Sequence, residues 1–182
     1  AAQKHHAVIV LDGTLSMGQQ AGAARAFNLS KKKASELVRA LPKGAQVSLV
    51  VLGQKARVEL AQSEDLYAAR ELLEALTISH GGAPMADALE LAEQCLAEAE
   101  KESKEHLRQE VYIFSDFQKS TWTRKGAGGE DPAKTFQRLD QLAECTLVDA
   151  GSSREFNYYF TALGPRTLFD GIASLPPGHH LT

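Results

Sequence analysis

Residues 7–16 read AVIVLDGTLS, an apolar run followed directly by a short polar stretch. The apolar part, Ala7 to Leu11, is typical of a strand that is buried on both faces of a sheet. Asp12, Thr14 and Ser16 then place one carboxylate and two hydroxyls at alternating positions where this strand ends. Such oxygens are hard ligands of the kind that Mg²⁺ or Mn²⁺ prefers. The stretch predicts either a metal site or, because these residue types are common in loops, a polar turn.

The composition is that of one soluble globular domain. A chain of 182 residues can bury most of its apolar surface in a single core, and its hydrophobic fraction of 43% is ordinary. The formal net charge of −3 gives no indication of nucleic acid as a partner, and no basic face with interleaved aromatic residues is present in the sequence. The sequence contains no recognisable signal peptide and no apolar stretch of membrane-spanning length. Because a strand begins almost at the first residue, we expect a fragment of a longer protein.

Strand-like runs alternate with helical patterns, which favours a mostly parallel sheet with crossover helices. Two β-rich runs at 46–52 and 57–60 are separated by only a few residues, so we expect a hairpin that adds one antiparallel edge strand. The charge-dense segment 98–110 is expected to prolong a helix into solvent. The other runs predict helices at 27–41, 65–76, from 85 onward and at 132–143, and strands at 111–114, 145–148 and 158–163.

These elements predict a doubly wound α/β fold with helices on both faces of the sheet. We assign residues 1–163 to this domain and residues 164–182, where the signals are weak and prolines cluster, to a C-terminal tail or linker. Asp116 follows the strand at 111–114 in the same way that Asp12 follows the first strand. Ligands of open α/β sheets bind beyond the carboxyl ends of the strands, where the strand order reverses. If the two strands are neighbours, both carboxylates lie in one crevice.

The order of these motifs resembles that of von Willebrand factor A domains. The chain has a D-x-[ST]-x-S strand end at 12–16, a Gly81-Gly82 loop that opens a helix, and then a strand that ends in Asp116. The segment 111–122, VYIFSDFQKSTW, is similar to bacterial members of the BatA type. The resemblance spans roughly residues 7–150. It implies a metal-ion-dependent adhesion-type site and a role in protein–protein interaction.

The resemblance also implies a role for each site residue. Thr14 and Ser16 would ligate Mg²⁺ or Mn²⁺ directly, while Asp12 and Asp116 would act mostly through hydrogen bonds to bound waters or to these hydroxyls. A carboxylate from the protein partner would complete the metal shell. The family places a further threonine ligand where this chain has Ala83, which has no side-chain oxygen. Water can replace a missing neutral ligand, so we expect a degenerate site with weak metal affinity.

Four residues are candidates for a rim around this crevice that contacts the partner: His80, Gly81, Gly82 and Trp122. An exposed Trp122 would be an effective interface anchor, whereas packing over an adjacent helix is the alternative. Relatives of the BatA type are often membrane-anchored. The resemblance therefore implies an extracytoplasmic bacterial domain that is tethered to a membrane only through segments outside this chain.

Enzymatic alternatives lack essential residues. The stretch 12–15 is similar to the D-x-D-G-T-L segment of haloacid-dehalogenase-like phosphatases, but the nucleophilic aspartate of that chemistry is replaced by Val10. Valine cannot form an aspartyl-phosphate. The sequence has no G-x-S-x-G elbow, P-loop or H-E-x-x-H motif. We expect a non-enzymatic interaction module, and the alternative is a structural scaffold domain whose site no longer binds metal.

The cysteines and the paired histidines give weaker signals. Cys95 and Cys145 lie far apart in apolar-patterned segments, which favours two small core residues over a disulfide. The pairs His5-His6 and His179-His180 lie near the two ends of the chain. We interpret them as exposed and incidental rather than as a site for a soft transition metal.

Overall fold

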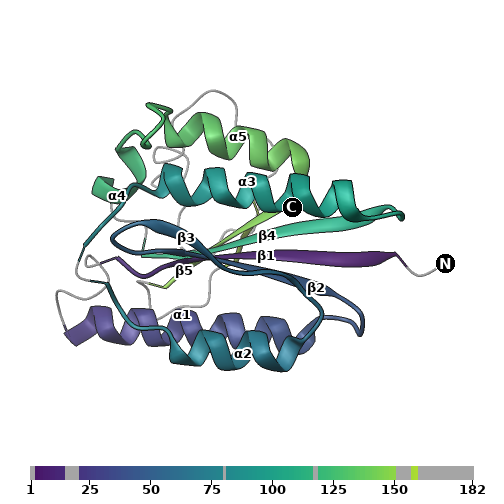
Figure 1. The fold of residues 1–182 in the computed structure, drawn as a ribbon. Coiled ribbons are helices and arrows are strands. Elements are labelled where there is room, and N and C mark those ends of the chain that lie inside the picture. The colour runs from purple at the N-terminus through teal and green to yellow at the C-terminus, as the bar shows by residue number, and fades with distance from the viewer. Residues whose placement is uncertain (1–2, 15–20, 80, 117–118, 151–156, 160–182) are drawn as a thin grey trace.

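The computed structural model describes residues 3–14, 21–79, 81–116, 119–150 and 157–159, and in these a six-stranded sheet lies between two layers of helices (Figure 1). Helices α1 and α2 cover one face, and α3 and α5 cover the other. This arrangement confirms the predicted doubly wound α/β fold. The strands are β1 (Lys4–Asp12), β2 (Gln46–Leu52), β3 (Ala56–Ser63), β4 (Leu107–Ser115), β5 (Glu144–Asp149) and β6 (Asn157–Tyr159). The helices are α1 (Ala21–Ala40), α2 (Leu66–Ala75), α3 (Met85–Glu102), α4 (Lys119–Thr123) and α5 (Pro132–Leu142).

The sheet has the strand order β3-β2-β1-β4-β5-β6. Strand β1 is parallel to both β2 and β4, and β4 is parallel to β5. Strand β3 is antiparallel to β2, as the hairpin prediction required, and β6 forms a second antiparallel edge beside β5. The chain leaves β1 toward one edge and returns to its other side at β4. The strand order therefore reverses at β1, so the carboxyl ends of β1 and β4 form the switch point of the sheet.

Strand β1 is buried on both faces, which explains its continuous apolar sequence. Val8 and Val10 pack under α3 and α5, while Ile9 and Leu11 pack on the opposite face over α1 and α2, and all four side chains are 0% exposed. Burial of each such side chain contributes about 1.5–3 kcal/mol. The first strand thereby becomes a rigid support for the polar residues that follow it.

The charged segment 98–110 prolongs a helix only as far as Glu102, and the rest of the prediction is wrong. Helix α3 ends at Glu102 and β4 begins at Leu107. The last charges of the segment lie on this strand, where Arg108 pairs with Glu110 at 3.0 Å and with Glu144 of β5 at 3.4 Å. Leu107 is buried at the start of β4, and a local charge pattern does not reveal such burial.

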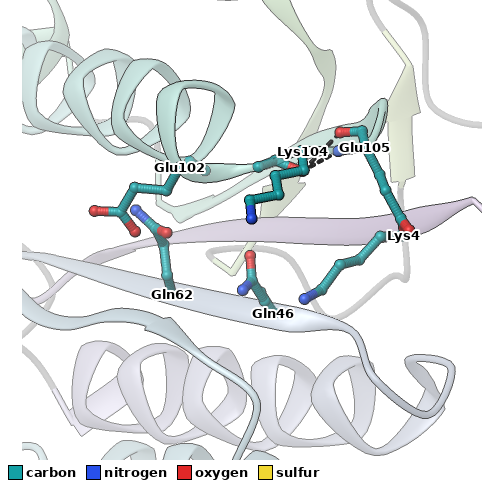
Figure 2. A pocket seen from close by; sticks show the side chains of 8 residues that line it. Lys4, Gln46, Gln62, Glu102, Lys104 and Glu105 are labelled. Atoms are coloured by element: carbon teal, nitrogen blue, oxygen red, sulfur yellow. Dashed lines mark hydrogen bonds between the residues drawn. The ribbon is translucent and has the colours of Figure 1, made fainter.

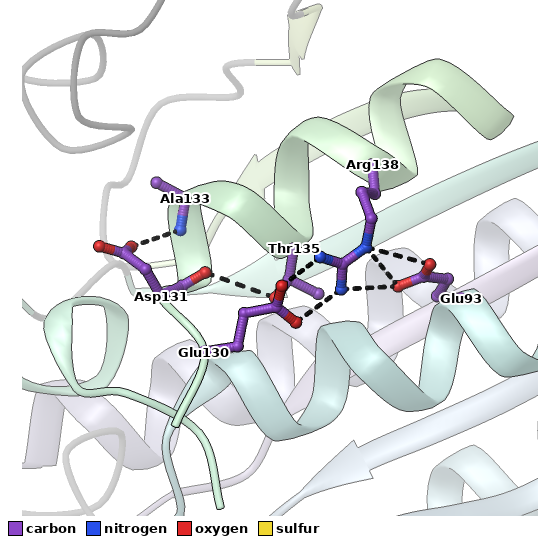
Figure 3. A network of polar contacts seen from close by, with 6 residues as sticks. All are labelled: Glu93, Glu130, Asp131, Ala133, Thr135 and Arg138. Atoms are coloured by element: carbon purple, nitrogen blue, oxygen red, sulfur yellow. Dashed lines mark hydrogen bonds and ion pairs between the residues drawn. The ribbon is translucent and has the colours of Figure 1, made fainter. Parts of the chain in front are cut away.

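A polar network joins the two helices that cover one face of the sheet (Figure 3). Arg138 of α5 lies between Glu93 of α3 and Glu130, which precedes α5. Its Nε is 3.1 Å from Glu93 Oε1, and its Nη2 is 2.6 Å from Glu130 Oε2. These contacts raise the pKa of the guanidinium and lower that of Glu130. Helix α5 itself begins with Pro132, behind an Asp131 side chain that accepts from the Ala133 amide at 2.9 Å.

His6 is buried, contrary to the expectation of an exposed histidine pair. Its ring is 1% exposed and bonds with Ser48 Oγ at 2.9 Å through Nε2 and with Gln109 Nε2 at 3.2 Å through Nδ1. Burial lowers the pKa of this ring to about 4. Cys95 and Cys145, by contrast, are buried free thiols, as predicted.

The predicted tail, 164–182, lies outside the described residues and includes the second histidine pair. No helix in the described part of the chain combines the length and the apolar character that a membrane crossing requires.

Candidate metal-ion site

The candidate site lies at the switch point, where β1 and β4 end side by side. Asp12 is the last residue of β1, and Ser115 is the last residue of β4. Phe114 pairs in register with Leu11, so the residue that follows each of them lies at the same edge of the sheet. Asp116 comes next in the chain and is half-buried. The parallel pairing of the two strands therefore brings the end of β4 beside Asp12, and Ser115 contacts it directly.

The Asp12 carboxylate is 0% exposed and accepts three hydrogen bonds. Oδ1 accepts from the Thr14 amide at 3.0 Å and from the Thr14 hydroxyl at 2.7 Å, and Oδ2 accepts from Ser115 Oγ at 2.7 Å. Burial raises the pKa of Asp12, while the three hydrogen bonds act in the opposite direction without cancelling the effect of burial. The ionised form of Asp12 is therefore less stable in the folded protein than in water, and its charge lowers the free energy of unfolding.

Trp122 lies behind the site and does not form an exposed rim, contrary to the rim prediction. It belongs to the short helix α4 and is only 3% exposed. Its Nε1 donates to Ser115 Oγ at 3.1 Å, and Ser115 in turn donates to Asp12. A buried indole needs a partner for its N–H, and the strand-end serine supplies one. The tryptophan therefore positions Ser115 and does not anchor a partner.

Backbone hydrogen bonds tie the loop after β1 to the adjacent loops. The Gly13 amide donates to the Leu52 carbonyl at 2.7 Å, and the Gly13 carbonyl accepts from the Ser79 amide at 3.0 Å. A Cβ at position 13 would lie 3.2 Å from the Leu52 carbonyl oxygen and 3.3 Å from Phe27 Cε2, so the close approach of these loops favours glycine. These contacts hold Gly13, and with it the turn from Asp12 to Thr14, against β2 and α1.

Ala83 lies where the resemblance expects a threonine ligand. Its amide donates to the Gly53 carbonyl at 2.8 Å, and its side chain is 8% exposed and packs in the core cluster that includes Met85 and Trp122. The backbone around the Gly81-Gly82 loop is therefore fixed, but the position offers no side-chain oxygen.

Arg124 was not recognised in the sequence. Its Nη2 donates to the carbonyl oxygen of Gly82, and this nitrogen lies 3.8 Å from the point where a Cβ on Gly82 would stand. Thr14 Cβ is also 3.8 Å from that point. A cation thus lies beside the polar cluster, and only the fold reveals it, because an arginine in a loop has no distinctive sequence pattern.

Ser16 and His80 lie outside the described residues. Of the other predicted site residues, the structure brings Asp12 and Thr14 into direct contact, adds Ser115 to them, and places Asp116 next in the chain. Gly82 lies beside Thr14 of this cluster, and its role in a rim stays a prediction. In the described ranges, no group of three or more histidine, cysteine or acidic side chains converges to hold a metal ion.

A pocket of about 340 Å³ lies at the opposite end of the sheet (Figure 2). It forms beside the amino ends of β1 and β2, at Lys4 and Gln46, and below the last turn of α3 at Glu102. Its other charged residues are Lys104 and Glu105, so both signs of charge line it. The pocket shares no residue with the cluster around Asp12 and is a separate feature of the surface.

The fold and the strand-end cluster agree with comparisons to known proteins. The model of the von Willebrand factor type A domain family matches residues 7–118, which is more than half of the chain, and the chain therefore belongs to this family. Domains of this family mediate protein–protein interactions, and they commonly bind a divalent metal at a metal-ion-dependent adhesion site. A comparison with curated proteins gave no match.

Several solved structures share the fold. Proximal thread matrix protein 1 from the mussel byssus has a TM-score of 0.63 at 14% identity, over 80% of this chain and 37% of that one. BatB from Bacteroides thetaiotaomicron, a conserved hypothetical protein, has a TM-score of 0.53 at 14% identity, over 80% and 65% of the two chains. An aerotolerance-related membrane protein from Bacteroides fragilis has 0.57 at 19% identity, over 78% and 65%. The chain thus spans less than two thirds of each of these proteins.

The residues at this strand end supply donor atoms of the type that a divalent cation prefers, but few of them. Asp12, Thr14 and Asp116 supply hard oxygen donors at one edge of the sheet. The Thr14 hydroxyl directs its proton toward the Asp12 carboxylate. The lone pairs of its oxygen therefore stay available for a cation. Ala83, at the position where the resemblance expects a threonine, has no side-chain oxygen to add to this set.

Proposed function

We propose that the chain is a non-enzymatic protein–protein interaction module that takes its partner at the carboxyl end of the sheet. The observation that supports this most directly is the burial of Asp12 at the switch point with a raised pKa. A carboxylate whose desolvation exceeds its compensation does not stabilise the fold, and such groups cluster at functional sites. Membership of the von Willebrand factor type A family supports protein–protein interaction as the kind of function.

The same cluster is the proposed metal site. Thr14 and, by the resemblance, Ser16 would ligate Mg²⁺ or Mn²⁺ directly, and Asp12 and Asp116 would support the ion through hydrogen bonds. When bound, the ion supplies positive charge that attracts a carboxylate of the partner protein. A structure of the mussel thread protein with a zinc-occupied site of this type, at a TM-score of 0.58 and 16% identity, supports the location. Ala83 makes the affinity of this chain weak.

We also propose an extracytoplasmic location for the domain, with membrane tethering by segments outside this chain. The support is the likeness in fold to BatB and to the aerotolerance-related membrane protein from Bacteroides. In this arrangement the carboxyl end of the sheet is the surface that binds a second protein. No nucleic acid is involved in the proposed interaction, in agreement with the net charge of −3.

The experiment that tests the site is thermal unfolding in EDTA and then in millimolar Mg²⁺ or Mn²⁺. A ligand that binds only the native state raises the free energy of unfolding by RT ln(1 + [L]/Kd). We expect a rise of about 0.5–1.5 kcal/mol for millimolar affinity, lost in Asp12→Ala. Glu100→Gln removes an exposed carboxylate on α3 and is the matched control, which should respond to metal as the wild type does.

A second candidate function is a structural scaffold domain whose site no longer binds metal. Ala83 favours it directly, and so does the full set of protein hydrogen bonds on Asp12. No metal-dependent rise in the unfolding midpoint of the wild type, at concentrations far above cellular levels, would establish this alternative.

A further inference from the structure

A groove of about 410 Å³ lies between α1 and α2, in the helix layer on one face of the sheet (Figure 1). The two helices run antiparallel along it. Near the end of α2, Lys31 Nζ donates to the carbonyls of Glu74 and Leu76 at 2.9 Å. Earlier on α2, Arg70 Nε donates to Ser35 Oγ at 3.1 Å, so positions rise along α1 as they fall along α2. None of the described residues that line the groove belongs to the candidate metal-ion site.

Positive charge predominates in this groove, although the whole chain has a formal net charge of −3. The charged side chains that line it are four basic ones and two acidic ones: Lys31, Lys32, Arg39, Arg70, Glu36 and Glu74. Among the described residues, none of these six takes part in an ion pair. A concave surface with an excess of one sign of charge attracts ligands of the opposite sign. The groove should therefore bind an anionic group.

Arg70 is oriented by the fold and still has unused donors. Its Nε bonds to Ser35, whereas in the described part of the chain its Nη1 and Nη2 make no hydrogen bond. These two nitrogens can donate to both oxygens of one carboxylate. The side chain is half-buried, so less conformational entropy is lost when a ligand binds it. Lys31, in contrast, is already occupied by the carbonyls at the end of α2 and contributes mainly its charge.

Three basic groups with available donors follow one line along the groove. Lys32 and Arg39 are both exposed and lie seven positions apart on α1, which is about 10 Å along the helix axis. Arg70 reaches Ser35, between them, from the opposite helix. The expected steps along this line are therefore about 4.5 Å and about 6 Å. Acidic residues at i, i+3 and i+7 of a partner helix are separated by the same steps and lie on one face.

Tyr67 gives the groove an aromatic rim of the kind that protein interfaces use. It lies one turn before Arg70 on the same flank of α2 and is 67% exposed. Its hydroxyl donates to Glu71 at 2.6 Å, which restrains the ring. Tyrosine is enriched at protein interfaces. A free inorganic anion would leave this ring in water, so the surface favours an anionic group that belongs to a protein.

A lipid membrane matches this surface less well than a helix does. A flat anionic surface would meet the basic groups and also the exposed carboxylates of Glu36, Glu71 and Glu74. A helix can place its carboxylates at the three basic groups and neutral residues opposite the carboxylates of the groove.

We propose that the groove between α1 and α2 binds an acidic helix of a protein partner, and that Lys32, Arg70 and Arg39 hold its carboxylates. The inference goes beyond the proposed function, because it places a second interaction surface on the α1–α2 layer. This surface requires no metal ion.

A synthetic acidic helix tests the proposal. The probe is the peptide acetyl-AAEAAEAAAEAAEA-amide, titrated in EDTA at low salt into the isotope-labelled chain and followed by NMR. We expect saturable shifts of the Lys32, Ser35 and Arg39 amides and of the Arg70 Nε–H, which weaken at high salt. The peptide with Gln in place of every Glu should give no saturable shifts. The charge-matched peptide acetyl-AEEAAAAEEAAAAA-amide has no glutamate pair at i, i+3 or i, i+4 and should bind at least about threefold more weakly.

Matched variants separate recognition by these groups from general charge and from folding. Lys32→Gln and Arg39→Gln should each weaken binding about twofold to fivefold, and Arg70→Lys should weaken it less than Arg70→Gln does. Glu36→Gln should tighten binding about twofold, because it removes a like charge from the groove. Lys101→Gln, on α3 of the other helix layer, is the control and should leave the affinity unchanged. Thermal unfolding of each variant verifies the fold, and the two exposed α1 variants decide the outcome if Arg70→Gln is unstable.

The outcomes also distinguish this inference from the proposed function. Equal affinity of the two glutamate peptides, or of the wild type and the two α1 variants, would overturn the inference. Inorganic phosphate that binds as tightly as the peptide would overturn it too, as would binding to phosphatidylglycerol vesicles without any response to the peptide. The metal-dependent rise in the unfolding midpoint is measured separately with Asp12→Ala, so its absence would contradict the proposed metal site and leave this groove unaffected.

Discussion

At the scale of single residues, the site contains a buried carboxylate that opposes folding, Asp12, and an alanine without a side-chain oxygen, Ala83. Asp12 is buried under three hydrogen bonds and yet has a raised pKa, so its charge opposes folding. Ala83, in contrast, packs as an ordinary core residue at the position where we propose that a hydroxyl would complete the ligand set. A cation at the site would offset the cost of Asp12, and the alanine limits how well it can do so. The affinity for metal should therefore increase when a hydroxyl is introduced at position 83.

Ala83→Thr should restore metal affinity, because it adds the absent oxygen on a backbone that is already held by the Gly53 carbonyl. We expect Mg²⁺ or Mn²⁺ to bind about tenfold more tightly, which corresponds to about 1.4 kcal/mol. The metal-dependent rise in the unfolding midpoint measures this. Ala83→Val adds the same bulk without the oxygen and should show no gain; an equal gain in both variants would mean that position 83 does not supply a ligand.

At the scale of the elements, each strand was easier to predict than the segment after it. The buried strands β1 and β4 follow from continuous apolar runs, and the hairpin of β2 and β3 follows from its short loop. Their pairing also made the meeting of Asp12 with the end of β4 predictable. The end of α3 at Glu102 and the start of β4 at Leu107 were missed within the charged segment 98–110, because local charge patterns do not report tertiary burial.

The elements that were missed around the site are short and depend on tertiary contacts. Helix α4 has five residues, too few for a periodic pattern, and Trp122 was therefore placed in a loop and considered as an exposed anchor. The contact of Arg124 with Gly82 joins residues that are 42 positions apart, which no local pattern encodes. His6 was misjudged for the same reason, since its partners Ser48 and Gln109 come from two other strands.

The ion pair between Arg138 and Glu93, which joins α5 to α3, should contribute little to stability. Arg138→Met keeps the length of the side chain but removes its donors to Glu93 (Figure 3). Because the guanidinium side chain is 40% exposed, water screens the pair. A double-mutant cycle with Glu93→Gln, followed by urea unfolding, should give a coupling free energy below about 1 kcal/mol. The coupling should fall further at high salt, and a salt-independent value would contradict the electrostatic explanation.

At the scale of the whole molecule, the central strand carries a buried titratable group near each of its ends. His6 lies in the first half of β1, on the side of the polar pocket, and Asp12 ends the strand at the candidate site. Both are removed from water, but their protonation affects stability with opposite signs. The ring of His6 is neutral in the native state and must take up a proton as the pH falls, whereas native Asp12 binds its proton more readily than an unfolded aspartate.

The dependence of stability on pH should therefore reflect mainly His6 between its two pKa values. The pKa of His6 falls from 6.5 in the unfolded chain to about 4 in the native state, so the unfolded state binds more protons in this window. Stability is fully present above pH 6.5 and is lost as the pH falls toward 4, by about 3 kcal/mol in total. Urea unfolding at a series of pH values measures the loss, and His6→Gln should flatten it.

Asp12, at the other end of β1, changes the free energy of unfolding with pH in the direction opposite to His6. Its native pKa is raised, so protonation on acidification favours the native state and offsets part of the loss from His6. Asp12→Asn removes this contribution and should make the acid loss steeper. Bound metal should act in the same direction, because it keeps the carboxylate ionised. If Asp12→Asn leaves the slope unchanged both with and without metal, then the carboxylate is not coupled to the stability of the domain, and its burial must have another cause.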